Sequence, residues 1–126
     1  MQSKPVGWFE IYVEDMKRAR AFYEAVFSIS LEKLEGPDQT VEMWSFPGPM
    51  DESNGASGAL VKMNGGPANG NGVIIYFNSK DCTIEASRVA SNGGEVTKEK
   101  FGLGKFGFAA LITDTEGNVI GLHSMQ

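Results

Sequence analysis

The stretch Glu14–Phe27, EDMKRARAFYEAVF, decides how the front of this chain folds. Asp15 stands where an N-cap belongs, because its carboxylate can accept the orphan amide hydrogens of a first helical turn. Behind it, apolar side chains recur at helical spacing, at Met16, Ala19, Tyr23, Val26 and Phe27. The stretch therefore predicts a helix over Asp15–Phe27. It directly follows Val6–Val13, whose aromatic and β-branched residues predict a strand.

Three more strands are predicted before the middle of the chain, at about Ile29–Leu34, Thr40–Phe46 and Ser57–Met63. The segment Asn64–Asn71 is rich in glycine and asparagine, which is typical of a linker. The first half of the chain therefore reads as βαβββ.

The same order of elements begins again after the linker. Asp81 is a candidate cap for a helix that ends near Gly93, since glycine adopts the left-handed conformation that closes helices. The predicted elements are a strand at Gly72–Asn78, a helix at Asp81–Asn92, and strands at Glu95–Lys100, Phe106–Thr113 and Asn118–Ser124. A tight turn at Glu116–Asn118 joins the last two strands.

The helix stretch and the closing segment Asp114–Leu122, DTEGNVIGL, together resemble the vicinal-oxygen-chelate superfamily of glyoxalases, extradiol dioxygenases and bleomycin-resistance proteins. The resemblance implies an α+β fold in which two βαβββ modules, about 6–63 and 72–124, form curved sheets around a cleft. It covers essentially the whole chain, 1–126, as a single glyoxalase-like domain. Within the superfamily the chain looks most like the glyoxalase-related proteins that begin with a Trp-Phe-Glu strand.

Metal-dependent relatives hold ligands at positions that in this sequence are Trp8, Val73 and Gly121, and a fourth on the strand that contains Ser57–Val61. Indole, isopropyl and glycine cannot donate a lone pair to a divalent cation. The chain has one histidine, so one protomer cannot supply two imidazoles. An all-oxygen site from Glu10, Glu42 and aspartates stays open. We predict no metal and no other cofactor.

Strand alternation predicts which side chains line the cleft, because side chains on one face repeat every two residues. If Trp8 occupies the ligand position, Glu10 and Tyr12 point the same way. By the same rule His123 shares the inner face with Gly121, while Ile75 and Phe77 share it with Val73. The predicted ligand-binding residues are Trp8, Glu10, Tyr12, Trp44, Val73, Ile75, Phe77, Lys105, Gly121 and His123.

Glu10 and His123 are the candidate catalytic residues, as an acid/base pair in a largely aromatic pocket. The alternative is structural: Glu10 belongs to a polar network, and His123 is a partly exposed residue at the end of a strand. An acid on an otherwise apolar strand needs a partner in either case.

Two further motifs have more than one interpretation. Gly102–Gly107 matches G-x-G-x-x-G, but it leads into a predicted strand rather than a helix, so a dinucleotide site is disfavoured. A loop over the cleft, with Lys105 able to meet an anionic group, fits better. Cys82 lies on the apolar stripe of the second helix, which favours a buried structural thiol over a nucleophile.

The bulk composition narrows the class of partner. With 11 basic and 16 acidic residues the net charge is −5, which argues against a nucleic-acid partner. Nothing in the sequence indicates a membrane surface or a signal peptide, so we predict a cytoplasmic protein. A single cysteine fits a reducing compartment. Exposed sheet edges and an open cleft lead us to predict a homodimer.

Two functions remain at this point. The first is a metal-free module that binds a small organic molecule in an apolar, aromatic cleft, as the bleomycin-resistance proteins of the superfamily bind theirs. The second is an enzyme, a lyase or isomerase related to lactoylglutathione lyase, that uses Glu10 in proton transfer.

Overall fold

The computed structural model describes residues 5–36, 39–48, 55–63 and 72–126. The predicted linker Asn64–Asn71 therefore lies outside the described residues. The chain divides into two compact units. The first unit is Trp8–Val73, and the second combines Met1–Gly7 with Ile74–Gln126.

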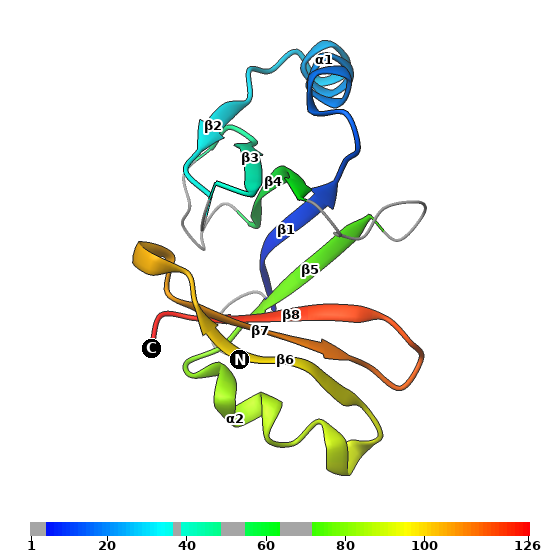
Figure 1. Ribbon diagram of the computed structural model, residues 1–126, viewed down its shortest axis with the longest axis vertical. Coiled ribbons are helices and arrows are strands. Elements are labelled where there is room, and N and C mark those ends of the chain that lie inside the picture. Colours follow the sequence, from blue (N-terminus) through cyan, green and yellow to red (C-terminus); the bar gives the residue numbers. More distant parts are fainter. Residues whose placement is uncertain (1–4, 37–38, 49–54, 64–71) are drawn as a thin grey trace. The chain divides into compact units, whose positions relative to one another are not determined.

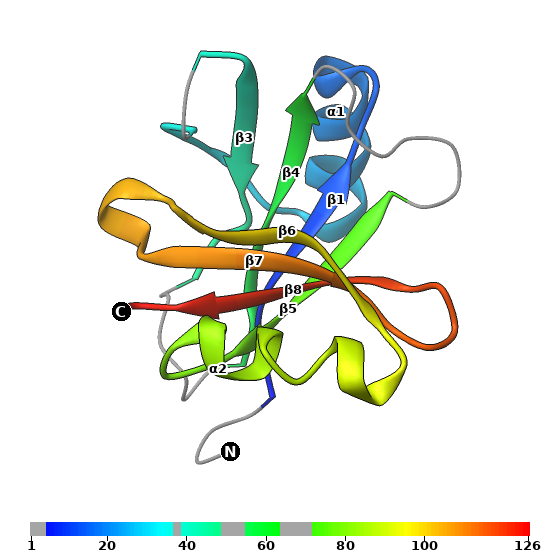
Figure 2. The same cartoon turned by 60° about the horizontal axis from the view of Figure 1, so that its bottom comes forward.

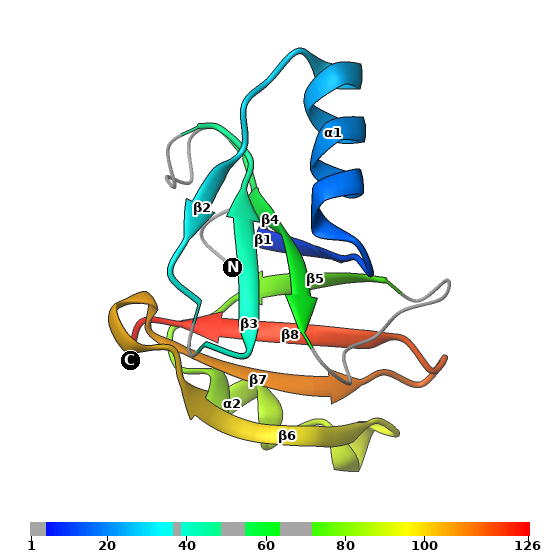
Figure 3. The same ribbon diagram turned by 45° about the horizontal axis from the view of Figure 1, so that its top comes forward.

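The first unit contains one helix and the first four strands of the chain, in the predicted βαβββ order. They are β1 (Val6–Tyr12), α1 (Met16–Phe27), β2 (Glu32–Leu34), β3 (Val41–Ser45) and β4 (Ser57–Met63). The strands lie in the order β2-β3-β4-β1. β1 runs parallel to β4, and the other pairs are antiparallel. Figure 3 shows α1 beside β4 in this unit.

Helix α1 begins where the sequence predicts. Asp15 is the N-cap, and its side chain accepts a hydrogen bond from the backbone N–H of Arg18 at 3.0 Å. The helix ends at Ser28, which adopts the left-handed conformation at φ 53°. Its apolar stripe packs on the sheet in a core formed by Met16, Leu31 and Leu60.

The second unit repeats the order of elements (Figure 1). They are β5 (Val73–Asn78), α2 (Cys82–Ala86), η2 (Ala90–Asn92), β6 (Glu95–Gly102), η3 (Gly104–Phe106), β7 (Phe108–Thr113) and β8 (Val119–Ser124). The strands lie in the order β5-β8-β7-β6, with β5 parallel to β8. β1 and β5 thus have equivalent places, since each opens its module and pairs in parallel with the module's last strand.

Helix α2 covers one face of the second sheet (Figure 2). Cys82 and Ala86 on α2 form a buried core with Ala110 and Leu122. The Cys82 side chain is fully buried, and its backbone N–H donates to the Ser124 hydroxyl at 3.1 Å. This placement confirms the expectation of a buried thiol on the apolar stripe.

The α+β fold with two βαβββ modules is confirmed, but several element boundaries differ from prediction. β6 continues to Gly102 rather than ending at Lys100, and β7 begins at Phe108 rather than Phe106, which lies in η3. The second helix ends at Ala86 rather than Asn92. The Ser87 hydroxyl donates to the Ile84 carbonyl, which competes with a continued helix, and a short 3₁₀ turn follows. Strand β2 begins at Glu32 rather than Ile29, because the Leu31 N–H is bound by the Glu24 carboxylate at 2.9 Å instead of a neighbouring strand.

The closing hairpin between β7 and β8 is held by one carboxylate. Asp114 Oδ1 accepts from the backbone N–H groups of Glu116 and Asn118, at 2.8 Å and 2.9 Å. Gly117 sits at φ 87°, where glycine has no steric penalty. Hydrogen bonds from the Asn118 side chain and backbone lower the pKa of Asp114. The predicted tight turn is confirmed.

Asp81 is the N-cap of α2, and its contacts predict how the stability of the fold changes in acid. The Thr83 hydroxyl and backbone N–H donate to its carboxylate, at 2.7 Å and 3.0 Å, and Lys100 lies at 3.1 Å. The Thr83 hydrogen bonds, followed by Lys100, lower the pKa of Asp81 from 3.8 to about 2. Because the folded pKa lies below the unfolded value, Asp81 stabilises the fold above pH 3.8, and this contribution is lost as the pH falls towards about 2.

We therefore expect the Asp81→Asn variant to lose less stability than the wild type over that acid range. Denaturant unfolding at a series of acidic pH values measures the slope of the unfolding free energy against pH. Glu99→Gln, which removes an exposed carboxylate from β6, is the matched control and should keep the wild-type slope. Equal slopes for wild type and Asp81→Asn would contradict the assignment.

In the described part of the chain, no helix is both long enough and apolar enough to cross a membrane.

Candidate functional site

Glu10 lies on β1 between two aromatic residues that both donate hydrogen bonds to it. The Trp8 indole N–H donates to Glu10 Oε2 at 3.1 Å, and the Tyr12 hydroxyl donates to Oε1 at 2.6 Å. Glu10 is only 9% exposed, whereas Trp8 and Tyr12 are half-buried. The predicted alternation is confirmed for these three residues. Both donors are neutral, so they hold the carboxylate in place without cancelling its charge.

The strand register shows which face of the sheet carries this row. Glu10 pairs with Ala59, and Ala59 pairs with Ser45, so small side chains flank the carboxylate across the sheet. Leu60, one residue on, points to the opposite face and packs against α1. Trp8, Glu10 and Tyr12 therefore form a row on the face turned away from α1. We call these three residues the Glu10 row.

Trp44 does not belong to this face. It pairs with Leu60 and packs in the core beneath α1. Its indole N–H donates to Glu42 at 2.9 Å, and the Arg20 guanidinium lies 3.5 Å from the centre of its ring. The structure thus places Trp44 in the packing of α1, on the other side of the sheet from Glu10. We leave it out of the proposed site.

The all-oxygen metal site that the sequence left open is not assembled from Glu10 and Glu42. Glu42 shares the α1 face with Trp44, whereas Glu10 lies on the opposite face. Among residues 5–36, 39–48, 55–63 and 72–126, no group of three or more His, Cys, Asp or Glu side chains could hold a metal ion. The positions where the resemblance places ligands hold Trp8, Val73 and Gly121, so the donor set does not fit the superfamily's metal.

In the second unit, Gly121 makes room for an aromatic ring. Gly121 on β8 pairs in parallel with Tyr76 on β5, so the two residues face the same side. A Cβ atom at position 121 would overlap the Tyr76 ring, which is itself buried. Tyr76 was not among the predicted site residues, although the glycine across from it is a signal that could have indicated it.

The prediction that Ile75 and Phe77 share a face with Gly121 is wrong. Since Tyr76 is the partner of Gly121, its two neighbours on β5 point to the other side. Phe77 packs against the core beneath α2. Val73 and Ile75 follow the same alternation, and both are at least a third exposed. The error is a shift of one residue, made by aligning Val73 rather than Ile74 with the inner face.

His123 lies on the same face as Gly121, as predicted, two residues further along β8. Its Nε2 lies 2.6 Å from the carbonyl oxygen of Phe106 in the η3 turn. Lys105, from the same turn, is exposed, and its amine lies 5.3 Å from the centre of the Phe106 ring. Glu10 and His123 fall in different compact units, so their pairing stays a prediction.

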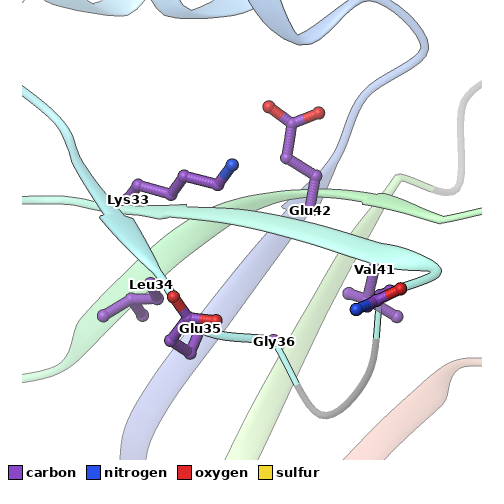
Figure 4. A pocket seen from close by; sticks show the side chains of 7 residues that line it. Lys33, Leu34, Glu35, Gly36, Val41 and Glu42 are labelled. Atoms are coloured by element: carbon purple, nitrogen blue, oxygen red, sulfur yellow. The ribbon is translucent and has the colours of Figure 1, made fainter.

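A separate pocket of about 430 Å³ lies at the connection between β2 and β3. It is lined by Lys33, Leu34, Glu35, Gly36, Gln39, Val41 and Glu42. Figure 4 shows Lys33 and Glu42 on one side of the ribbon and Leu34 and Glu35 on the other. None of the predicted ligand-binding residues lines it, whereas Glu42, a candidate for the all-oxygen metal site, does. This pocket was not predicted, because a polar connection between two strands carries no sequence pattern that distinguishes it from an ordinary loop.

A family model matches the chain over residues 6–122, that of the Glyoxalase/Bleomycin resistance protein/Dioxygenase superfamily. The chain belongs to this superfamily. The match spans both modules, so membership rests on nearly the whole chain rather than on one motif. No curated protein matches the chain significantly.

Solved structures with the same fold include two kinds of protein. Methylmalonyl-CoA epimerase from Mycobacterium tuberculosis is 16% identical with a TM-score of 0.69, covering 98% of this chain and 89% of that one. The hypothetical protein BH1468 from Bacillus halodurans C-125 is 15% identical with a TM-score of 0.74, covering 100% and 96%. A Streptomyces coelicolor methylmalonyl-CoA epimerase variant in complex with 2-nitronate-propionyl-CoA is 16% identical with a TM-score of 0.68, covering 98% of each chain. At these identities the likeness shows the fold.

Proposed function

We propose that this member of the superfamily binds a small organic molecule without a metal, and that the Glu10 row is its principal contact. The observation that carries the proposal is the arrangement of a nearly buried carboxylate between two aromatic donors on one strand face. Burying a charged group costs free energy, and the hydrogen bonds from Trp8 and Tyr12 help to offset that cost. A site that recognises a ligand provides a reason to keep it.

The chemistry of the row indicates the kind of ligand. The indole and phenol rings offer flat apolar surface, which suits an aromatic or other apolar body. A carboxylate accepts hydrogen bonds only, so the ligand presents a hydroxyl, N–H or ammonium group to Glu10. The small neighbours Ala59 and Ser45 add no bulk beside the carboxylate.

Native mass spectrometry of protein purified gently from its source tests the proposal. We expect a stoichiometric adduct of small mass, which fragmentation identifies as an organic compound with a hydrogen-bond donor. Glu10→Gln should lose the adduct, whereas Glu14→Gln, an exposed carboxylate just beyond β1, should keep it. An adduct that survives Glu10→Gln unchanged would contradict the assigned role of Glu10.

A second candidate is a proton-transfer enzyme, a lyase or isomerase. The observation that favours it is the 2.6 Å hydrogen bond from the Tyr12 hydroxyl to Glu10, which holds one carboxylate oxygen and fixes the direction of the other. The name of the methylmalonyl-CoA epimerases agrees with such chemistry on this fold. Glu10 would then accept a proton from a ligand carbon, and the electron pair would remain on the ligand, delocalised into an adjacent carbonyl.

Deuterium exchange separates the two candidates. When the captured compound is incubated with protein in D₂O, an enzyme of this kind places deuterium on carbon, whereas a binding module leaves every C–H bond unlabelled. Glu10→Gln abolishes labelling if Glu10 is the base.

A further inference from the structure

The His123 imidazole has one nitrogen engaged by the backbone, and this decides the chemistry of the other. A carbonyl oxygen accepts hydrogen bonds and donates none. The contact of 2.6 Å between Nε2 and the Phe106 carbonyl therefore requires a hydrogen on Nε2. In the neutral ring this leaves the lone pair on Nδ1, which becomes the accepting nitrogen.

The carbonyl that fixes this tautomer belongs to a turn closed by its own backbone. Leu103 N–H donates to Gly107 O at 2.7 Å, and Phe106 N–H donates back to Leu103 O at 3.2 Å. Gly107 has φ 91°, and a Cβ atom there would overlap the Ser124 carbonyl on β8. Glycine at 107 therefore lets the turn approach the end of β8, the strand that carries His123.

The strand register places the ring among side chains that suit a binding face. His123 pairs with Ala109 on β7 and with Asn78 on β5, on the face turned away from α2. Tyr76 lies on this same face beside Gly121. The second unit thus brings together a half-buried imidazole, an amide and an aromatic ring on one sheet face.

We propose that His123 is a ligand-binding residue that accepts a hydrogen bond through Nδ1, and that the Leu103–Gly107 turn is the positioning element that holds this tautomer. The ligand group is one that donates a hydrogen bond, such as an ammonium, hydroxyl or amide N–H. The stretch Gly102–Gly107 then has a role that its G-x-G-x-x-G pattern does not suggest. This inference stands apart from Glu10, because it uses only residues of the second unit.

Nitrogen NMR tests the tautomer directly, since the chain has one histidine and hence a single pair of imidazole nitrogen signals. In ¹⁵N-labelled protein, at a pH where the ring is neutral, we expect Nε2 to carry the proton in at least roughly a tenfold excess over Nδ1. A spectrum in which Nδ1 is protonated, or in which the two forms are equally populated, overturns the proposal.

A variant of the turn and two small probes test the positioning and binding roles. Gly107→Ala should shift the tautomer ratio towards equality, whereas Glu99→Ala, at an exposed position on β6, should not. Ethylammonium, a donor, should move the Nδ1 resonance of the wild type, and acetate, an acceptor, should not. An unchanged ratio in folded Gly107→Ala, or no response to ethylammonium, counts against the proposal. If Gly107→Ala does not fold, the wild-type spectrum and the two probes still decide it. A negative outcome here would not bear on the proposed role of Glu10, because the Glu10 experiments test residues of the other unit.

Discussion

Replacing Glu10 by glutamine is expected to weaken binding of the captured compound by roughly ten- to a hundredfold. The amide keeps the size of the side chain but loses the charge, and its NH₂ group replaces one accepting oxygen. That NH₂ group then faces a donor, either the Trp8 indole N–H or the Tyr12 hydroxyl. A hydrogen bond to a charged partner contributes about 1.5–3 kcal/mol, which sets the expected loss. Isothermal titration calorimetry with the purified compound measures it.

Two matched variants show whether the loss belongs to the carboxylate itself. Tyr12→Phe removes the donor 2.6 Å from Glu10 but keeps the ring, so a smaller loss is expected. Glu14→Gln removes a nearby exposed charge and should bind as the wild type does. If Glu14→Gln and Glu10→Gln weaken binding equally, the effect comes from net charge and the Glu10 row is not the site.

Placing glutamate at Gly121 is expected to destabilise the protein by at least about 2 kcal/mol. The new Cβ would overlap the buried ring of Tyr76, and the carboxylate would be forced into a buried position on β8. The superfamily resemblance places a metal ligand at this position. The Tyr76 ring fills the space into which a side chain at position 121 would project. Denaturant unfolding of Gly121→Glu measures the loss.

The control for this change is Val119→Glu, on the same strand and the same face but 46% exposed, where a small effect is expected. A double-mutant cycle adds Tyr76→Ala. Removal of the ring should make Gly121→Glu less harmful, so that the two changes are not additive. Additive losses would show that the Tyr76 ring is not what excludes a side chain at 121.

The order of elements was predictable because it depends on local signals. Asp15 caps α1 and Asp81 caps α2 at the predicted residues, and Asp114 organises the last hairpin. The misplaced boundaries depend on side chains that meet only in three dimensions. The Glu24 carboxylate accepts a hydrogen bond from the Leu31 N–H, so β2 begins only at Glu32. No pattern in Ile29–Leu34 indicates this contact.

The site was predictable only where alternation within one strand was enough. Trp8, Glu10 and Tyr12 share a face because they are two residues apart. Residues on different strands depend on register, which the sequence does not fix. Trp44 therefore lies on the α1 face, contrary to prediction. Tyr76, rather than the predicted Ile75 and Phe77, lies beside Gly121. The Phe106 carbonyl could not be found either, since every residue carries a carbonyl group.

The most direct test of metal-free binding at the Glu10 row is calorimetric titration of the captured compound into metal-stripped protein. The donor set predicts that wild-type protein treated with a chelator binds with the same affinity as untreated protein, and that added Zn²⁺, Ni²⁺ or Mn²⁺ changes nothing. Glu10→Gln should be weakened equally in both preparations. Loss of binding on chelation, restored by one equivalent of a divalent metal, would contradict the account and return the chain to the metal-dependent members of its superfamily.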